Sequence, residues 1–372
     1  MDHRQDAEFF AVVTPGLETV CAGELTALAM AGVRVEAGGV AFRGRLADLY
    51  RANLWLRSAS RILVRFADFR CRDFPRLYQH AGKLPWGRFL RAETAIDLRV
   101  SCRQSRLMHS DRVRQALLPA IDQARGRPAP ATESGTQLIL VRIADDVVQI
   151  SIDSSGELLH RRGYRQQVTV APLRETLAAG ILLQLGWDGA QPLYDPMCGS
   201  GTFLIEAALL AKRRAPGLAR SFAFMQWPGW RPGLWDKLCS DARRGESACP
   251  VTIAGSDRDG SAVRAALANL RTAGLDQNLR VACASLEALQ PQAGCGLLVC
   301  NPPYGLRLAP VSLAAFYQSL GRELVRAFPR WRKALLCPDP DLVTMTGLPW
   351  QHLANLDNGG LRVGLFVCDG EE

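Results

Sequence analysis

The stretch LLVCNPPYGLRL, residues 297–308, joins an apolar run to a tetrapeptide that no strand continues. Pro302 and Pro303 lack backbone N–H donors and have restricted φ, so the chain must leave the strand there. Asn301 offers a side-chain oxygen as an acceptor, and Pro302 fixes the backbone so that a main-chain carbonyl points into the same site. Two acceptors facing one exocyclic NH₂ suit the amine of a nucleobase, and Tyr304 supplies a ring that stacks on an extruded base.

The amine of a nucleobase is a poor nucleophile, because its lone pair is delocalised into the ring. Acceptors for both of its protons shift the nitrogen toward sp³ geometry and stabilise the positive charge that develops when it attacks. The tetrapeptide therefore favours chemistry on an exocyclic amine. Standing alone, it would equally well be a strand terminator followed by a turn.

A second candidate site is DPMCGSGTFLIEAALLA, residues 195–211, which reads as a strand end, a Gly-x-Gly turn and a helix. Glycines let the backbone approach a ligand closely, and the helix N-terminus offers free N–H groups. A dinucleotide-binding turn would carry a third glycine near position 204, where this chain has Leu204. It would also have an acid about 20 residues further on, whereas the best candidate here, Asp257, comes much later. No Gly-Lys-Ser/Thr follows, as a phosphate-binding loop would require. Nicotinamide enzymes and NTPases are therefore disfavoured.

Two acids end the next apolar run, in AGSDRDGSAVRAALANLRTAG, residues 254–274. Asp257 stands at the carboxyl end of the expected strand, where a carboxylate beside the glycine turn accepts both hydroxyls of a ribose. Asp259 is instead expected to cap the following helix.

From about residue 190 onward, strands and helices alternate, and these elements position the candidate residues. The candidate strands are PLYDP, VTIAGSD, LRVACAS, LLVCN, KALLCP, HLANLD and VGLFVCD. Continuous apolar strands separated by helical stretches predict an α/β fold with a mainly parallel, doubly wound sheet. An insertion at 212–250, containing FAFMQWPGW, exceeds ordinary α/β connection lengths.

The first 155 residues have a different pattern. Residues 7 to about 70 read as β-α-β-β-α-β, a small ferredoxin-like unit. Residues 72–155 read as a helix near 74–90, a strand, a second helix and a hairpin that turns at Asp145-Asp146.

Bulk properties restrict the class of protein. A hydrophobic fraction of 48% and a charged fraction of 22% are those of an ordinary globular protein. No apolar run approaches the ~20 residues of a membrane span, and MDHRQDAEFFAVV does not read as a signal peptide. The eleven cysteines form no CxxC, and five histidines accompany them, which favours neither a metal site nor a disulfide framework. A reducing cytoplasm fits this composition.

The net charge of +9 is uneven. Residues 1–165 hold 25 Lys and Arg against 18 Asp and Glu, whereas the rest holds 20 against 18. A basic front half indicates a polyanionic partner. Arginine predominates among these cations, which genomic base composition alone could also produce.

Together these stretches resemble the class I S-adenosylmethionine-dependent methyltransferases that carry an N-P-P-Y motif. SCRQSRLMHSDRVRQAL (101–117), VVQISIDSSGELLHRRGYR (147–165) and APLRETLAAGIL (171–182) look like THUMP-containing RNA methyltransferases, as does FAFMQWPGW. The resemblance is closest to the RlmL-like 23S rRNA guanine-N2 methyltransferases. It implies a ferredoxin-like domain at 1–71, a THUMP domain at 72–155, a linker and helix at 156–190 and a Rossmann-like methyltransferase domain at 191–372.

The resemblance also implies roles for the candidate residues. Asn301, Pro302 and Tyr304 would hold the target base, and the LRET segment (173–176) would lie near the cofactor. Ser285 stands where the family usually has an acid near the cofactor adenine, so cofactor binding could be weaker. The residues implied to bind S-adenosylmethionine are Asp195, Pro196, Cys198, Gly199, Ser200, Gly201, Asp257, Ser285 and Asn301.

The resulting hypothesis is methyl transfer to guanine N2 in structured RNA, either 23S rRNA or a ribosome assembly intermediate. One methyltransferase domain implies one methylation activity, and no metal is expected. The oligomeric state is left open. The alternatives are a tRNA guanine-N2 methyltransferase, a DNA adenine-N6 methyltransferase and a non-catalytic RNA-binding or assembly protein. RNA contacts are assigned to four arginines of the front half: Arg103, Arg106, Arg112 and Arg114.

Overall fold

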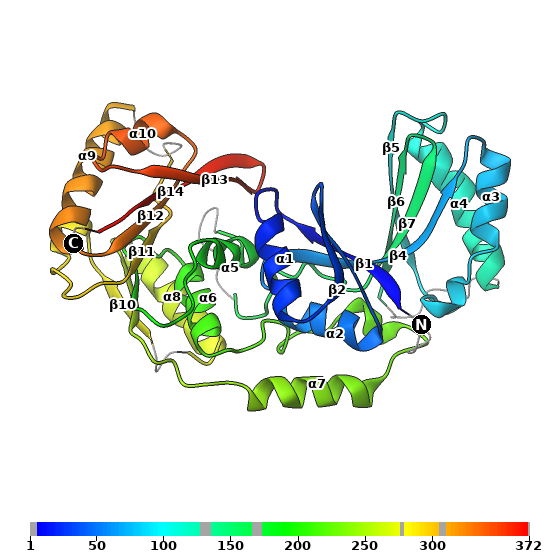
Figure 1. Cartoon of the computed structure of the whole chain (residues 1–372), viewed down its shortest axis with the longest axis horizontal. Coiled ribbons are helices and arrows are strands. Elements are labelled where there is room, and N and C mark those ends of the chain that lie inside the picture. The colour runs from blue at the N-terminus through cyan, green and yellow to red at the C-terminus, as the bar shows by residue number, and fades with distance from the viewer. Residues whose placement is uncertain (1–5, 127–134, 166–172, 276–278, 305–309, 371–372) are drawn as a thin grey trace. The chain divides into compact units, whose positions relative to one another are not determined.

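The computed structural model describes residues 6–126, 135–165, 173–275, 279–304 and 310–370. The chain forms two compact units, whose elements are labelled in Figure 1. Unit 1 comprises Met1–Val13, Cys21–Leu159 and Gly217–Ser240; unit 2 comprises Thr14–Val20, His160–Pro216 and Asp241–Glu372. No helix in the described ranges is long and apolar enough to cross a bilayer.

Unit 1 is built on a seven-stranded sheet with the order β2-β3-β1-β4-β7-β6-β5. Its first elements follow the predicted β-α-β-β-α-β order: β1 (Ala7–Val13), α1 (Glu18–Ala27), β2 (Ala31–Glu36), β3 (Gly39–Gly44), α2 (Leu46–Trp55) and β4 (Ala59–Arg70). The remainder comprises α3 (Phe74–Gly82), η1 (Trp86–Arg88), β5 (Ile96–Arg103), α4 (Ser110–Arg125), β6 (Gln137–Ala144) and β7 (Val147–Asp153). Helices α3 and α4 lie side by side against this second half (Figure 1).

The strand β4 belongs to both halves of this sheet. Its first residues pair with β1, where Phe9 lies opposite Val64, and its last residues pair with β7, where Arg70 lies opposite Val147. A strand of 12 residues is long enough to serve two neighbours in turn. The two predicted N-terminal regions therefore share one continuous sheet.

The aromatic insertion packs within unit 1, which its position in the chain does not indicate. It contains η2 (Ala223–Gln226) and the start of α7 (Pro232–Arg244). The Trp227 indole N–H donates to the Gln137 side chain at 2.7 Å, and the Phe224 ring stacks on Tyr50 with centroids 4.3 Å apart. Arg220 donates to the backbone carbonyls of Leu158 and Glu157 at 2.8 and 2.6 Å. These contacts tie the insertion to α2, to the first residue of β6 and to the residues that follow β7.

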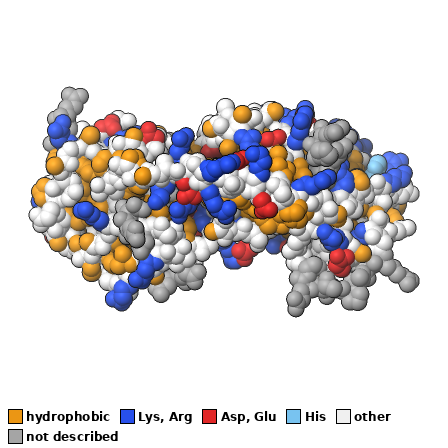
Figure 2. All heavy atoms as spheres, turned by 90° about the horizontal axis from the view of Figure 1, so that it is seen from below, with side chains coloured by type: hydrophobic (Ala, Val, Ile, Leu, Met, Phe, Trp, Pro, Cys, Tyr) orange, Lys and Arg blue, Asp and Glu red, His pale blue; other side chains and the backbone are white. Residues whose placement is uncertain are grey.

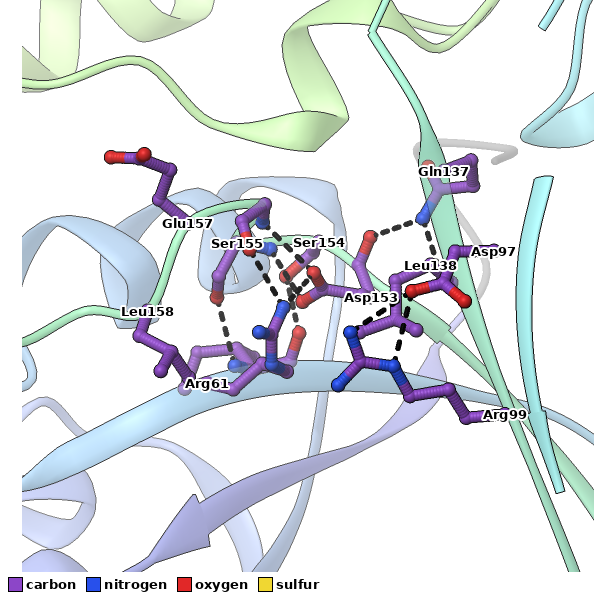
Figure 3. Close-up of polar contacts among 12 residues, drawn as sticks. Arg61, Asp97, Arg99, Gln137, Leu138, Asp153, Ser154, Ser155, Glu157 and Leu158 are labelled. Atoms are coloured by element: carbon purple, nitrogen blue, oxygen red, sulfur yellow. Dashed lines mark hydrogen bonds and ion pairs between the residues drawn. The ribbon is translucent and has the colours of Figure 1, made fainter. Parts of the chain in front are cut away.

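A buried ion pair lies where β4 meets the end of β7 (Figure 3). The Arg61 guanidinium donates to the Asp153 carboxylate and, at 2.7 Å, to the Gly156 carbonyl. The backbone N–H groups of Ser155 and Gly156 donate to the same carboxylate, each at 3.0 Å. Asp153 is fully buried, and this burial raises the pKa of its carboxyl group while Arg61 acts in the opposite direction. The pair fixes the point at which the chain leaves the sheet.

Unit 2 contains the predicted doubly wound sheet, with the order β10-β9-β8-β11-β12-β14-β13. All seven strands expected from the sequence are present, parallel except where β14 pairs with β12 and β13. The strands are β8 (Leu193–Asp195), β9 (Ile253–Asp257), β10 (Leu279–Cys283), β11 (Leu297–Cys300), β12 (Arg332–Cys337), β13 (Gln351–Asn358) and β14 (Leu361–Cys368). The helices are α5 (Glu175–Gln184), α6 (Thr202–Ala211), α8 (Gly260–Thr272), α9 (Pro310–Ala327) and α10 (Pro340–Thr344), with η3 (Leu286–Ala288).

The central strands of unit 2 are buried because helices pack on both faces of the sheet. Every residue of β11 is buried, and Leu298 and Cys300 join Leu335 and Cys337 of β12 in one apolar cluster against α9. Helix α6 is buried along almost all of its length, as expected of a helix enclosed by the domain. This packing holds the carboxyl ends of β8, β9, β10 and β11 rigidly at one edge of the sheet.

Candidate active site

The glycine turn between β8 and α6 adopts the sharp geometry that its sequence predicts. Gly199 and Gly201 have φ of 51° and 82°, values that L side chains rarely adopt. The turn is anchored to β9, since the Cys198 N–H donates to the Ser256 carbonyl at 2.9 Å and the Ser256 hydroxyl donates to the Pro196 carbonyl at 3.5 Å. The start of α6 is thereby held against the neighbouring strand end.

Asp257 braces the same turn. One carboxylate oxygen accepts the Gly199 N–H at 2.9 Å, and the other accepts the Asp259 N–H at 2.9 Å. A carboxylate has about four lone-pair sites, so acceptor capacity remains for the two ribose hydroxyls of a nucleoside. Asp259 accepts from the Ser261 N–H at 2.8 Å and caps α8, as predicted.

Of the two acids at this edge, Asp257 is the one that suits a cationic ligand, because burial favours the neutral form of Asp195. Asp195 is 2% exposed, and burial, with a smaller effect of Asp257, raises the pKa of its carboxyl group to about 8. No Lys or Arg of the described ranges pairs with Asp195 or Asp257. S-adenosylmethionine carries a positive sulfonium and an ammonium group, so the residues present fit this cofactor. Burial also raises the pKa of the Cys198 thiol, which disfavours the thiolate that a nucleophile would require.

Replacing Asp257 with alanine is expected to raise the dissociation constant for S-adenosylmethionine by roughly 10- to 100-fold, because charge-assisted hydrogen bonds contribute about 1.5–3 kcal/mol. Isothermal titration calorimetry measures this directly. Asp259→Ala is the matched control: it removes a neighbouring acid that caps α8 and should leave cofactor affinity unchanged. Equal affinities in the two variants would exclude a binding role for Asp257.

Ser285 lies two residues beyond β10, at the same edge of the sheet, and it is exposed. Its side chain hydrogen-bonds the carboxylate of Glu287, an interaction that helps to lower the pKa of Glu287, after the larger effect of that residue's own backbone N–H. The acid expected at position 285 is thus replaced by a serine with a carboxylate two residues away. The sequence interpretation did not consider Glu287.

The tetrapeptide Asn301 to Tyr304 leaves the sheet directly after β11. Leu297 and Leu298 pair with Leu193 and Tyr194 of β8, so the tip of β11 and the glycine turn leave adjacent strands. The Tyr304 hydroxyl donates to the Asn301 side-chain oxygen, and both side chains are half-buried. The acceptor predicted for a substrate amine is therefore paired with a donor supplied by the protein itself.

Tyr304→Phe is expected to keep methyl transfer, with kcat within about 3-fold and an unchanged or slightly lower KM for the nucleic acid. The substitution retains the ring and removes a hydroxyl that competes for Asn301, a hydrogen bond contributing about 1 kcal/mol. Tyr304→Ala should lower kcat/KM by roughly 10- to 100-fold, because stacking on a base contributes about 1–3 kcal/mol. Steady-state kinetics checks both. A phenylalanine variant as impaired as the alanine variant would show that the hydroxyl takes part in the reaction.

Two further side chains, absent from the sequence interpretation, support the glycine turn. The buried Asn269 of α8 donates to the Ser200 carbonyl at 3.1 Å. Arg165 donates to the Thr202 hydroxyl at 2.8 Å and lies 3.1 Å from the buried carboxylate of Glu175, whose pKa burial raises to about 7. Glu175 belongs to the LRET segment, so α5 is linked to the start of α6 through Arg165. No local pattern in the sequence marks these long-range contacts.

The four arginines assigned to RNA lie in unit 1, with different surroundings. Arg103, Arg106 and Arg112 are exposed, whereas Arg114 is half-buried and donates to the Leu98 carbonyl at 3.1 Å and to Asp111 at 3.0 Å. Arg114 therefore has a structural role in addition to any contact with RNA. Figure 2 shows scattered Lys and Arg side chains among the atoms in view, with fewer Asp and Glu side chains. In the described ranges, no group of three His, Cys, Asp or Glu side chains could hold a metal ion.

Three family models match successive parts of the chain. The RlmL ferredoxin-like domain matches residues 8–63, the THUMP domain matches residues 71–153, and the methyltransferase domain described as RMKL-like matches residues 162–354. The last match covers more than half of the chain.

Known proteins of this kind are similar along almost the whole chain. A putative RNA methyltransferase of Synechocystis is 36% identical over 96% of this chain and 95% of its own length. The ribosomal RNA large subunit methyltransferase K/L of Syntrophotalea carbinolica is 40% identical over 97% of this chain. The chain spans about half, 53%, of that relative's length. The crystal structure of a putative methyltransferase complexed with SAH has a TM-score of 0.90 and 30% identity, covering 99% of both chains.

The fold, the glycine turn and the N-P-P-Y tip thus occur together with a ferredoxin-like and a THUMP domain. S-adenosylmethionine is the methyl donor in this family. The chain belongs to the RMKL-like methyltransferases that carry RlmL ferredoxin-like and THUMP domains.

Proposed function

We propose that this protein transfers a methyl group to the exocyclic N2 amine of a guanosine in structured RNA, and that the RNA is 23S rRNA, free or in an assembly intermediate. The observation that carries the proposal is the half-buried Asn301 oxygen at the tip of β11, already paired with a hydroxyl donor. A substrate amine would replace the Tyr304 hydroxyl on this oxygen. The name of the K/L relative, which refers to large-subunit ribosomal RNA, supports the choice of RNA.

S-adenosylmethionine would supply the methyl group as an electrophile with a neutral thioether as leaving group. Asp257 and the glycine turn would orient it, and the buried Asp195 would hold the start of that turn by accepting the Met197 N–H. Asn301 and the carbonyl fixed by Pro302 would accept hydrogen bonds from the amine, and Tyr304 would stack on the base. The methylated nitrogen would then release one proton to water. Orientation and hydrogen-bond acceptance would supply most of the rate enhancement.

A DNA adenine-N6 methyltransferase would use the same N-P-P-Y chemistry, but it has no use for a THUMP domain. A tRNA substrate, in contrast, would fit both the N-P-P-Y tip and the THUMP domain. Incubation of the purified protein with labelled S-adenosylmethionine and 23S rRNA, tRNA or duplex DNA distinguishes these cases. We expect N2-methylguanosine in 23S rRNA. Label in N6-methyladenine or in tRNA alone would contradict the proposal.

A further inference from the structure

A cavity of about 190 Å³ lies at the carboxyl end of β12, outside the site described above. Its polar lining is His352 and Asn355 of β13 and Arg362 of β14, and its apolar lining includes Pro338, Pro340 and Phe366. A cation, an imidazole and an amide thus share a small space with flat apolar walls. The cavity is well below the roughly 300 Å³ at which sites for drug-sized ligands begin.

The hairpin of β13 and β14 creates this space through its register. Gly364 lies opposite Cys337 of β12 and Asn355 of β13. A Cβ at Gly364 would lie 2.5 Å from the Phe366 ring, so only glycine leaves room here. The His352 ring meets the Phe366 ring edge-on at 5.3 Å, and its Nε2 lies 3.2 Å from the Asn355 side-chain oxygen. The His352 and Asn355 side chains are thus positioned by each other and by the Phe366 ring.

Arg362 is exposed and forms no ion pair or side-chain hydrogen bond within the described part of the chain. Its guanidinium is thus available to a ligand. A planar guanidinium binds a phosphate through two parallel hydrogen bonds, and the side-chain N–H groups of Asn355 would add donors beside it.

The cavity lies at the same edge of the sheet as the base-holding tetrapeptide. Strands β11 and β12 are parallel, with Cys300 opposite Leu335, so Asn301 and Cys337 both follow at the carboxyl end. Tyr304 also hydrogen-bonds Asn358, the last residue of β13. The hairpin that lines the cavity therefore reaches the side chain that would stack on the target base.

We propose that this cavity binds the phosphodiester and sugar of the nucleotide adjoining the methylated one. A base that leaves its stack carries its backbone with it, so an enzyme must hold the neighbouring phosphate. Arg362 would bind the phosphate, and Pro338 and Phe366 would pack on the sugar. This inference rests on the proposed RNA substrate.

The test compares Arg362→Ala with Arg280→Ala in the full-length protein. Arg280 lies on β10, the outermost strand on the side of the sheet away from β13 and β14. It is likewise exposed and without a described partner. Arg362→Ala is expected to raise the Kd for the RNA substrate about 10-fold and to reduce the slope of log Kd against log salt by about 1. Asn355→Asp, which places a carboxylate in the cavity, should weaken RNA binding in the same direction. Affinity for S-adenosylmethionine should stay unchanged in all three variants.

Each outcome bears on one of the two proposals. If the unaltered protein methylates RNA and Arg362→Ala matches Arg280→Ala in Kd and salt slope, the cavity proposal is overturned while the proposed function stands. If the unaltered protein methylates no RNA, both are overturned. A lower RNA affinity in Arg362→Ala and Asn355→Asp, but not in Arg280→Ala, supports the cavity as a nucleotide subsite.

Discussion

Replacing Asn301 with alanine is expected to lower kcat for methyl transfer by roughly 100- to 1000-fold while leaving RNA and cofactor binding nearly intact. This is the usual cost of removing one preorganised hydrogen-bonding group that acts on charge developing in the transition state. The side chain stands at the tip of β11, and its oxygen is already paired with the Tyr304 hydroxyl. Single-turnover kinetics with saturating RNA and S-adenosylmethionine separates the chemical step from binding.

Asn301→Asp is the conservative comparison, because it keeps an acceptor oxygen of the same reach. It should retain more activity than Asn301→Ala. An alanine variant that methylates RNA at the unaltered rate would remove Asn301 from the mechanism. An alanine variant that no longer binds RNA would instead make Asn301 a binding residue.

Replacing Arg61 with alanine is expected to destabilise the protein by roughly 3–5 kcal/mol, because it leaves a buried carboxylate without its charged partner. The side chain of Arg61 is 13% exposed and that of Asp153 is fully buried, and the two also hold the start of the chain that leaves β7. Urea unfolding of the full chain, followed by tryptophan fluorescence, measures the change.

Arg99→Ala is the matched control, since Arg99 pairs with Asp97 close by in Figure 3 with side chains 64% and 42% exposed. An exposed pair contributes less than about 1 kcal/mol, so this variant should unfold almost as the unaltered protein does. Equal stabilities for the two variants would mean that the Arg61 pair is compensated by water or by neighbouring backbone groups.

The parts of the fold that sequence could predict are those with a local signal. Each strand of the unit 2 sheet is an apolar run, and the glycine turn and the two prolines mark where strands end. These signals predicted that Asp195, Asp257 and Asn301 stand at the carboxyl ends of neighbouring strands. The parallel pairing of β8 with β9 and β11 confirms this placement.

Contacts between distant segments could not be predicted in this way. Trp227 bonds Gln137 across 90 positions, and Asn269 bonds Ser200 across 69. An aromatic cluster in an insertion does not reveal which surface it will cover, and an asparagine on a helix resembles any polar residue there. The cavity beside β12 depends on the register of β13 and β14, which no single residue encodes.

Nucleoside mass spectrometry of rRNA and tRNA from a strain lacking this protein tests the central claim most directly. The prediction is that N2-methylguanosine decreases in 23S rRNA, remains in tRNA, and returns when the unaltered gene, but not the Asn301→Ala variant, is restored. An unchanged set of modified nucleosides in both RNA classes would contradict the assignment of methyl transfer to RNA guanine.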